Sequence, residues 1–173
     1  SNEEEEESIT MTTWFTADLH IGHANILKYA HRPFSSVGEM DDALVSRWNG
    51  IVGANDEVYI VGDFALCKPS HALEVARALK GRKFLIRGNH DKDLADKLVR
   101  EGLFEWVKDI HTVKIPDGEA HKSIQRIVLF HYAMRVWDRS HHGAYHLYGH
   151  SHGSLPENPN SLSFDIGVDC WDY

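Results

Sequence analysis

The chain alternates short β-prone runs with helical patterns, and this alternation restricts the folds open to it. The early β-prone runs are TTWFTA, EVYIVG and KFLIRG, and helical patterns separate and follow them at residues 24–30, 39–51, 70–81 and 91–102. The later runs, VKDIHTVKI, IQRIVLF, YHLYG and SFDIGV, are mostly strands without helices between them. Strands alternating with helices favour parallel pairing, whereas successive strands favour mixed or antiparallel pairing. The sequence therefore predicts an α/β domain with parallel pairing early and mixed pairing late.

Length and composition favour a single domain. With 173 residues, 42% of them hydrophobic, the chain can bury a core without support from disulfides. Residues 1–10 carry the acidic block Glu3 to Glu7 and no hydrophobic periodicity, which is typical of a solvated tail. Because Met11 is a natural start, we interpret residues 1–10 as a disordered acidic tail, wholly or partly foreign to the natural protein. We expect residues 11–173 to form the domain.

Charge and cysteine usage restrict partners and location. The formal net charge is -8, much of it from the acidic tail, so nucleic acid is neither favoured nor excluded as a ligand. No run reaches the roughly 18 apolar residues that span a bilayer, and the start lacks a signal pattern. Cys67 and Cys170 are isolated, a usage typical of a reducing compartment. We expect a cytoplasmic protein without a membrane partner, and the oligomeric state stays open.

Five of the apolar runs are followed by the same kinds of polar residue. In open α/β sheets, ligands bind outside the carboxyl ends of the strands, so residues dispersed along the sequence can converge there. Any one histidine in such a place is more often structural, but the repetition after five runs favours one common site. The residues concerned are Asp18, His20, Asp63, Asn89, His90, His131, His150 and His152.

The donor types indicate a metal centre. Oxygen and nitrogen donors without a thiolate suit Mn, Fe, Zn, Ni or Co, and they argue against a structural zinc site built on cysteine. Even without His90, which follows Asn89 directly, the seven other residues exceed one tetrahedral shell. They fit two adjacent divalent ions that share a carboxylate, an arrangement that clamps phosphate oxygens with the ions about 3.5 to 4 Å apart.

The ordered motifs resemble those of a known superfamily. DLH at 18–20, GD at 62–63, GNHD at 88–91, the later His131 and GHSH at 149–152 are similar to the motif set of the calcineurin-like metallophosphoesterases, in particular a small bacterial and phage branch. The resemblance implies a four-layer α/β/β/α sandwich. One departure is GDFAL, where Leu66 stands at the place of a second carboxylate.

The resemblance also implies which residues hold the metals. One ion would be bound by Asp18, His20, Asp63 and His152. The other would be bound by Asp63, Asn89, His131 and His150, so that Asp63 bridges the pair. Mn is the expected metal in vitro.

The implied activity is hydrolysis of a phosphomonoester or phosphodiester by in-line attack of a metal-bridging hydroxide. His90 would act as general acid, and Asp91 would either orient its ring or cap the following helix. A small molecule or nucleotide is favoured over nucleic acid as substrate. Four polar residues could reach its phosphate, each with a structural alternative: His23, Asn25, Arg32 and Arg135.

Two other functions stay open. A nuclease acting on single-stranded DNA or RNA would use the same dinuclear site. A metal-binding interaction scaffold that has lost catalysis is the alternative from another class. The intact GNHD argues against the scaffold, because a proton donor is not needed merely to hold metal.

Overall fold

The computed structural model describes residues 10–117 and 123–173. The predicted acidic tail therefore lies, apart from Thr10, outside the described residues. Four parallel strands form the first sheet in the order β1-β2-β3-β4, and the early parallel pairing is confirmed. Their bounds are Thr13–Thr16 for β1, Glu57–Val61 for β2, Arg82–Ile86 for β3 and Trp106–Lys108 for β4.

The second sheet has the order β5-β6-β7-β8 and mixed pairing, also as predicted. β5 and β6 pair antiparallel, whereas β6, β7 and β8 run parallel to one another. Their bounds are Ile110–Asp117 for β5, Ser123–Phe130 for β6, Tyr145–Tyr148 for β7 and Ser163–Asp165 for β8.

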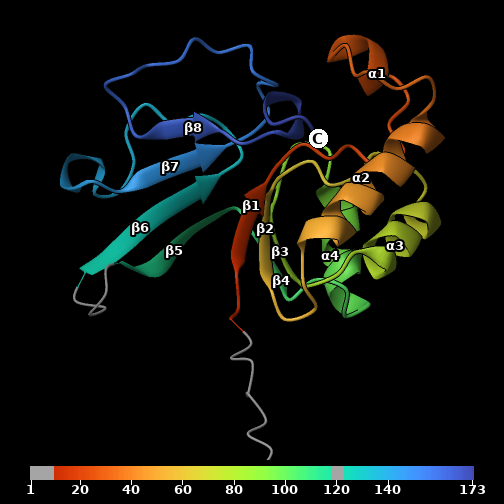
Figure 1. Ribbon diagram of the computed structural model, residues 1–173, viewed down its shortest axis with the longest axis horizontal. Helices are drawn as coiled ribbons and strands as arrows, with labels where there is room; N and C mark the ends of the chain where they lie inside the picture. Colours follow the sequence, from red (N-terminus) through yellow and green to blue (C-terminus); the bar gives the residue numbers. More distant parts are fainter. Residues whose placement is uncertain (1–9, 118–122) are drawn as a thin grey trace, which may run out of the picture.

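Helices pack against one face of the first sheet (Figure 1). The longest, α2, begins after Ser36, whose hydroxyl accepts a hydrogen bond from the Glu39 N–H, and the Glu39 carboxylate accepts from the Ser35 N–H. This reciprocal capping fixes the start of the helix. The α-helices are α1 (Ile26–Tyr29), α2 (Val37–Ile51), α3 (Pro69–Ala78) and α4 (Lys92–Arg100), and two 3₁₀ turns are η1 (Ser140–His142) and η2 (Val168–Cys170).

Alternation along β2 explains why the first sheet has apolar residues on both faces. Val58 and Ile60 belong to the core shared with the helices, whereas Tyr59 and Val61 belong to the core shared with the second sheet. Successive side chains of a strand point to opposite faces, so a strand covered on both faces reads as a continuous apolar run.

The predicted fourth layer is not confirmed. Within residues 10–117 and 123–173 the layers are helices, first sheet and second sheet, and all α-helices precede residue 101. Among the described residues after Arg100, the helical segments are the 3₁₀ turns η1 and η2, and none is an α-helix. Among the described helices, none is long and apolar enough to cross a membrane.

Candidate metal centre

The polar residues predicted from the strand ends meet in one place. The described part of the structure contains three groups of three residues, and within each group the ligand atoms lie within 4.8 Å of one another. Together the groups include residues that follow β1, β2, β3, β6 and β7. The first group is Asp18, His20 and His152, the second group is Asp63, His131 and His150, and a further combination, His20 with Asp63 and His90, shares a residue with each of them.

Left-handed backbone conformations mark the same residues. The φ angles are 58° at Asp18, 52° at His20, 54° at Asp63, 65° at His150 and 46° at His152. Non-glycine residues rarely adopt positive φ, and such strain concentrates at functional sites. Five strained residues in one cluster therefore indicate that the fold is organised around the site.

Two glycines allow the ligand loops to approach one another. A Cβ at Gly62 would lie 2.0 Å from His131 Nδ1, and a Cβ at Gly88 would lie 2.3 Å from Asp63 Oδ1. Neither position can hold a side chain without displacing a ligand candidate. This gives a steric reason for the glycines of the GD and GNHD motifs.

The first group contains an orphaned ring nitrogen. His20 Nε2 is buried and has no hydrogen-bond partner among the residues that the structure describes, and it lies 3.6 Å from Asp63 Oδ2. Burial lowers the pKa of His20 to about 3, so the ring is neutral near pH 7. A buried neutral imidazole nitrogen facing carboxylates fits a cation, since an unmade hydrogen bond there would otherwise be costly.

Burial has the opposite effect on Asp18. It raises the pKa of this carboxyl to about 7, although the neighbouring His152 and the His150 N–H favour the ionised form. Both oxygens of Asp18 accept from the His150 N–H, at 3.1 and 2.9 Å. A carboxyl that is costly to ionise in an apolar setting would gain strongly from a nearby cation.

The second group gathers around one oxygen of Asp63. Asp63 Oδ1 accepts from the His90 N–H at 2.9 Å, which leaves Oδ2 facing His131 Nε2 at 3.3 Å as well as His20. Burial opposes the charge of Asp63, but His131 and the His90 N–H outweigh it and hold its pKa at about 2. Asp63 is therefore ionised and faces both groups, as a bridging ligand must.

Asn89 joins this group through its side-chain oxygen. Asn89 Oδ1 lies 3.1 Å from His131 Nε2 and 3.0 Å from His150 Nδ1. His131 Nδ1 is 2.9 Å from the Val61 carbonyl, which fixes the Nδ1–H tautomer and leaves Nε2 free for a metal. Tyr132 borders this side of the site, with its ring centroid 4.7 Å from that of His150.

His90 lies beside the ligand candidates of both groups. Its ring centroid is 5.4 Å from that of His20 and 5.6 Å from that of His23. His23 Nδ1 in turn lies 3.0 Å from His20 Nδ1. The structure therefore brings His23 and His90 to the site, where each is close enough to contact a bound ligand.

The contacts of Asp91 fit neither of the roles that the sequence suggested, which were orienting the His90 ring and capping α4. Its carboxylate accepts backbone N–H bonds from Asp63 at 2.9 Å, Phe64 at 2.9 Å and Gly88 at 2.6 Å, and it makes no side-chain cap bond to α4. The side chain is thus directed at the loops after β2 and β3, and not at the ring of His90. It holds the Asp63 loop against the loop that carries Asn89.

We expect Asp91→Ala to lower the free energy of unfolding by about 3 kcal/mol or more, because three buried N–H groups would each lose a partner at about 1 to 3 kcal/mol. Urea denaturation of the metal-free protein measures this. Asp93→Ala, an exposed acidic residue in the first turn of α4, is the matched control. Equal stability of the Asp91 and Asp93 variants would contradict the structural role.

Arg32 does not have the freedom that a phosphate contact requires, so that prediction is corrected. Its guanidinium is buried, and its five N–H groups are matched by five acceptors. These acceptors are Asp169 Oδ1, Asp169 Oδ2, the Leu19 carbonyl, the Asp18 carbonyl and Met40 Sδ. Asn25 and Arg135 are exposed, and their contact with a substrate stays a prediction.

Asp169 is the site residue that sequence reasoning missed. Its Oδ2 lies 2.7 Å from His152 Nδ1, and both of its oxygens contact Arg32. It follows SFDIGV, the last apolar run of the chain. The same rule that found the other residues, a polar residue just after a strand, would have found it if applied to this run.

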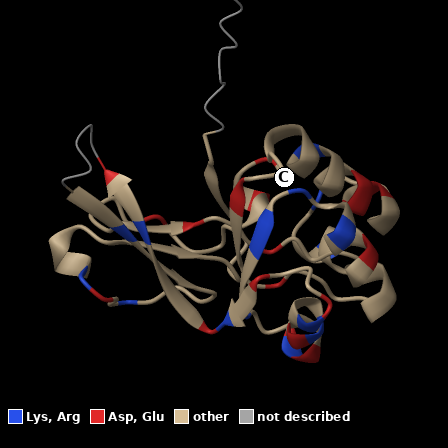
Figure 2. Ribbon diagram, turned by 90° about the horizontal axis from the view of Figure 1, so that it is seen from below, with Lys and Arg blue, Asp and Glu red and all other residues tan. Residues whose placement is uncertain are grey.

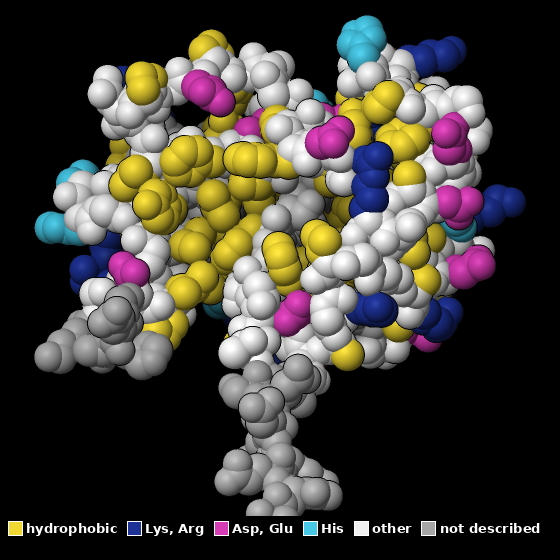
Figure 3. All heavy atoms as spheres, viewed as in Figure 1, with side chains coloured by type: hydrophobic (Ala, Val, Ile, Leu, Met, Phe, Trp, Pro, Cys, Tyr) yellow, Lys and Arg dark blue, Asp and Glu magenta, His cyan; other side chains and the backbone are white. Residues whose placement is uncertain are grey.

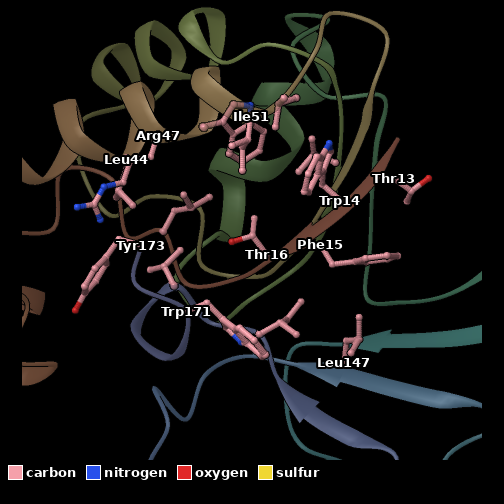
Figure 4. A pocket seen from close by; sticks show the side chains of 16 residues that line it. Thr13, Trp14, Phe15, Thr16, Leu44, Arg47, Ile51, Leu147, Trp171 and Tyr173 are labelled. Carbon is pink, nitrogen blue, oxygen red and sulfur yellow. The ribbon is translucent and has the colours of Figure 1, made fainter. Parts of the chain in front are cut away.

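An apolar cavity lies elsewhere. It has a volume of about 460 Å³ and is lined by α2, by β1 and by the C-terminal segment (Figure 4). Figure 4 shows Ile51, Phe15 and Trp171 around it, and Figure 3 shows hydrophobic side chains gathered on this face. None of the metal-ligand candidates lines it.

Acidic and basic residues alternate within the helical layer. Figure 2 shows acidic and basic residues interspersed there, and α4 alone contains Lys92, Asp93, Asp96, Lys97 and Arg100. A protein that tracks a nucleic-acid backbone is expected to carry a basic stripe.

Two four-stranded sheets with buried aspartates and histidines at their strand ends make this an α/β protein with groups that could hold a metal ion. No family model matches the chain. It is 30% identical to the Gene 66 protein of Mycobacterium phage L5, in an alignment that covers 92% of this chain and 87% of that protein. The chain therefore belongs to the family of the Gene 66 protein.

Two further comparisons extend this result. An uncharacterized protein of Methanocaldococcus jannaschii is 46% identical over 81 residues, a match that spans 46% of this chain and 46% of that relative. A solved structure of a protein of unknown function from Aquifex aeolicus aligns with a TM-score of 0.67 and 21% identity, over 94% of this chain and 93% of that one. The second likeness shows a shared fold.

Proposed function

We propose that this protein is a two-metal phosphoesterase of the calcineurin-like superfamily, which hydrolyses a phosphomonoester or a phosphodiester. The observation that carries the proposal is the position of Asp63, whose Oδ2 faces His20 Nε2 on one side and His131 Nε2 on the other. The orphaned His20 nitrogen supports a cation on the first side, and the convergence of Asn89 Oδ1 on His131 and His150 supports one on the second.

The chain's own residues would hold the two ions and orient the substrate. Asp18, His20, Asp63 and His152 would bind one ion, and Asp63, Asn89, His131 and His150 the other. Two divalent ions in such a centre would lower the pKa of a shared water and neutralise charge on the phosphate oxygens. Oxygen and nitrogen ligands suit Mn, which we propose as an activating metal.

His90 is the proposed general acid. Its backbone N–H is bonded to Asp63 Oδ1, so the loop that carries its ring is fixed relative to the bridging carboxylate. A protonated ring there could transfer its proton to the departing ester oxygen. His23, partly exposed beside His90 and His20, could donate a hydrogen bond to the phosphate.

A small substrate is favoured over a polymer. Acidic and basic residues are interspersed in the helical layer, whereas a protein that follows a nucleic-acid backbone is expected to carry a basic stripe (Figure 2). The exposed Tyr132 ring beside His150 offers an apolar border for the group attached to the phosphate.

A substrate panel on metal-stripped protein tests the proposal. Phosphomonoesters, phosphodiesters, single-stranded DNA and single-stranded RNA would each be assayed with Mn, Ni, Zn and Mg. We expect metal-dependent hydrolysis of a small ester. Cleavage of the nucleic acids alone would replace the proposal by a nuclease, and metal binding without hydrolysis of any substrate would favour an interaction scaffold.

Metal affinity should rise with pH in the slightly acidic range. The pKa of Asp18 is about 7 through burial, so below that pH a metal must displace its proton. Hydrogen bonding to Asp169 raises the pKa of His152. A metal must therefore displace a proton from His152 as well at acidic pH, which also makes binding stronger as the pH rises. Each proton displaced strengthens apparent binding up to about tenfold per pH unit below the group's pKa, and the effect levels off above it. Equilibrium dialysis with Mn at several pH values measures this, and an affinity independent of pH from about 5.5 to 7 would contradict it.

A further inference from the structure

We propose that the buried ion pair between Arg32 and Asp169 positions the ligands of one metal ion and not those of the other. Both are positioning residues, acting through Asp18, His20 and His152. The inference rests on the metal centre of the proposed function, but not on the reaction carried out there.

Asp169 fixes the ring of His152. A carboxylate oxygen 2.7 Å from Nδ1 requires the proton on that nitrogen, which leaves Nε2 as the metal-binding atom. His152 is partly exposed, and the Asp169 carboxylate is the hydrogen-bond partner of its ring among the described residues. Loss of that carboxylate would remove this restraint on the orientation of the ring.

Arg32 fixes the other two ligands through their backbone. Its Nη2 donates to the Asp18 carbonyl at 2.6 Å and its Nη1 to the Leu19 carbonyl at 2.9 Å. Asp18 and His20 have φ angles of 58° and 52°, so the peptide groups between these two strained residues are the ones that the guanidinium holds. Strained backbone persists only where its surroundings determine it.

The ion pair joins these two restraints. Arg32 Nε donates to Asp169 Oδ1 at 2.9 Å and Nη2 donates to Oδ2 at 3.0 Å, in a bidentate contact between buried side chains. One buried pair thus links the turn after β1 to the loop after β7. A planar guanidinium fork suits this geometry, whereas the single charge of lysine does not.

The ligand side chains of the second group are held by other contacts, although the backbone N–H of His150 also donates to the Asp18 carboxylate. His131 is oriented by the Val61 carbonyl, and Asp63 by the His90 N–H. Neither Arg32 nor Asp169 contacts His131, His150 or Asn89 in any hydrogen bond of the described residues. Loss of the ion pair should therefore weaken one ion site selectively.

The inference is tested by measuring the affinities of the metal-stripped protein for a first and a second Mn ion by equilibrium dialysis. Asp169→Asn should bind one ion with wild-type affinity and the other about 10- to 100-fold more weakly, the range for loss of a residue that supports a ligand. Arg32→Lys should weaken the same ion, and it keeps the test open if the Asp169 variant does not fold. Asp172→Asn removes an exposed carboxylate three residues further along and should bind both ions normally.

A double variant separates positioning from general destabilisation. Because Asp169 acts both through His152 and through Arg32, Asp169→Asn should cause a smaller loss of affinity in a His152→Ala background than in the wild-type protein. Equal weakening of both ions, additive losses in the double variant, or two ions bound at wild-type affinity would each overturn the inference. If Mn binds as described but no phosphate ester is hydrolysed, the proposed function fails and the inference on Arg32 and Asp169 stands.

Discussion

Asp63→Asn is expected to lose both metal ions and, with them, metal-dependent hydrolysis. Asp63 Oδ2 is the oxygen shared by the two ligand groups, and its charge acts on both sites at once. An amide keeps the shape of the side chain but removes that charge. The loss in affinity for each ion should exceed the factor of about 10 to 100 that follows when only a supporting contact is removed.

Asp18→Asn provides the comparison, because Asp18 belongs to the first group alone. It should weaken one ion and leave the other bound. Metal analysis of both variants after dialysis measures the difference. Two ions per chain at unchanged affinity in the Asp63 variant would show that this carboxylate is not the bridge.

His90→Asn is expected to retain both ions yet lose a factor of about 10² to 10⁴ in rate, the range for removal of a general acid. The loss should depend on the leaving group. An alkoxide departs poorly without a proton, whereas a nitrophenolate is already a stable anion near neutral pH. Rates on an alkyl ester and on a nitrophenyl ester, measured together with metal content, test the assignment.

Asp91→Asn distinguishes a structural role of Asp91 from a role in orienting the His90 ring. Because the Asp91 carboxylate accepts three backbone bonds, its replacement should lower stability and should slow both esters equally. His90→Asn should instead slow mainly the alkyl ester. If the His90 variant loses metal, or slows both esters to the same extent, His90 is a ligand or a charge stabiliser and not the proton donor.

Part of the convergence of the site was predictable because it depends on short-range rules. Parallel strands bring their carboxyl ends to the same edge of a sheet, so residues just after β1, β2 and β3 were expected to lie close together, and likewise those just after β6 and β7. The meeting of these two sets depends on how the two sheets pack, which the rule does not predict. The mixed pairing of the later strands followed from the absence of helices between them. Asp18 and Asp63 could be placed in this way without knowledge of any side-chain contact.

The contacts of Arg32 could not be predicted in the same way. Its partner Asp169 is 137 residues away in the sequence, and no local pattern joins the two. An arginine near a predicted metal site is equally compatible with substrate binding and with a buried ion pair, and only tertiary structure decides between them. The fourth layer was implied by the resemblance alone, since no helical pattern occurs late in the sequence. Its α-helices are not found among the described residues.

The most direct test of the two-metal account follows hydrolysis and bound Mn together as the metal is added back to stripped wild-type protein. The account predicts two ions per chain, with hydrolysis of a small phosphate ester that rises as the second ion binds. Full activity with one ion or with none would contradict it, as would a chain that binds two ions and hydrolyses no phosphate ester.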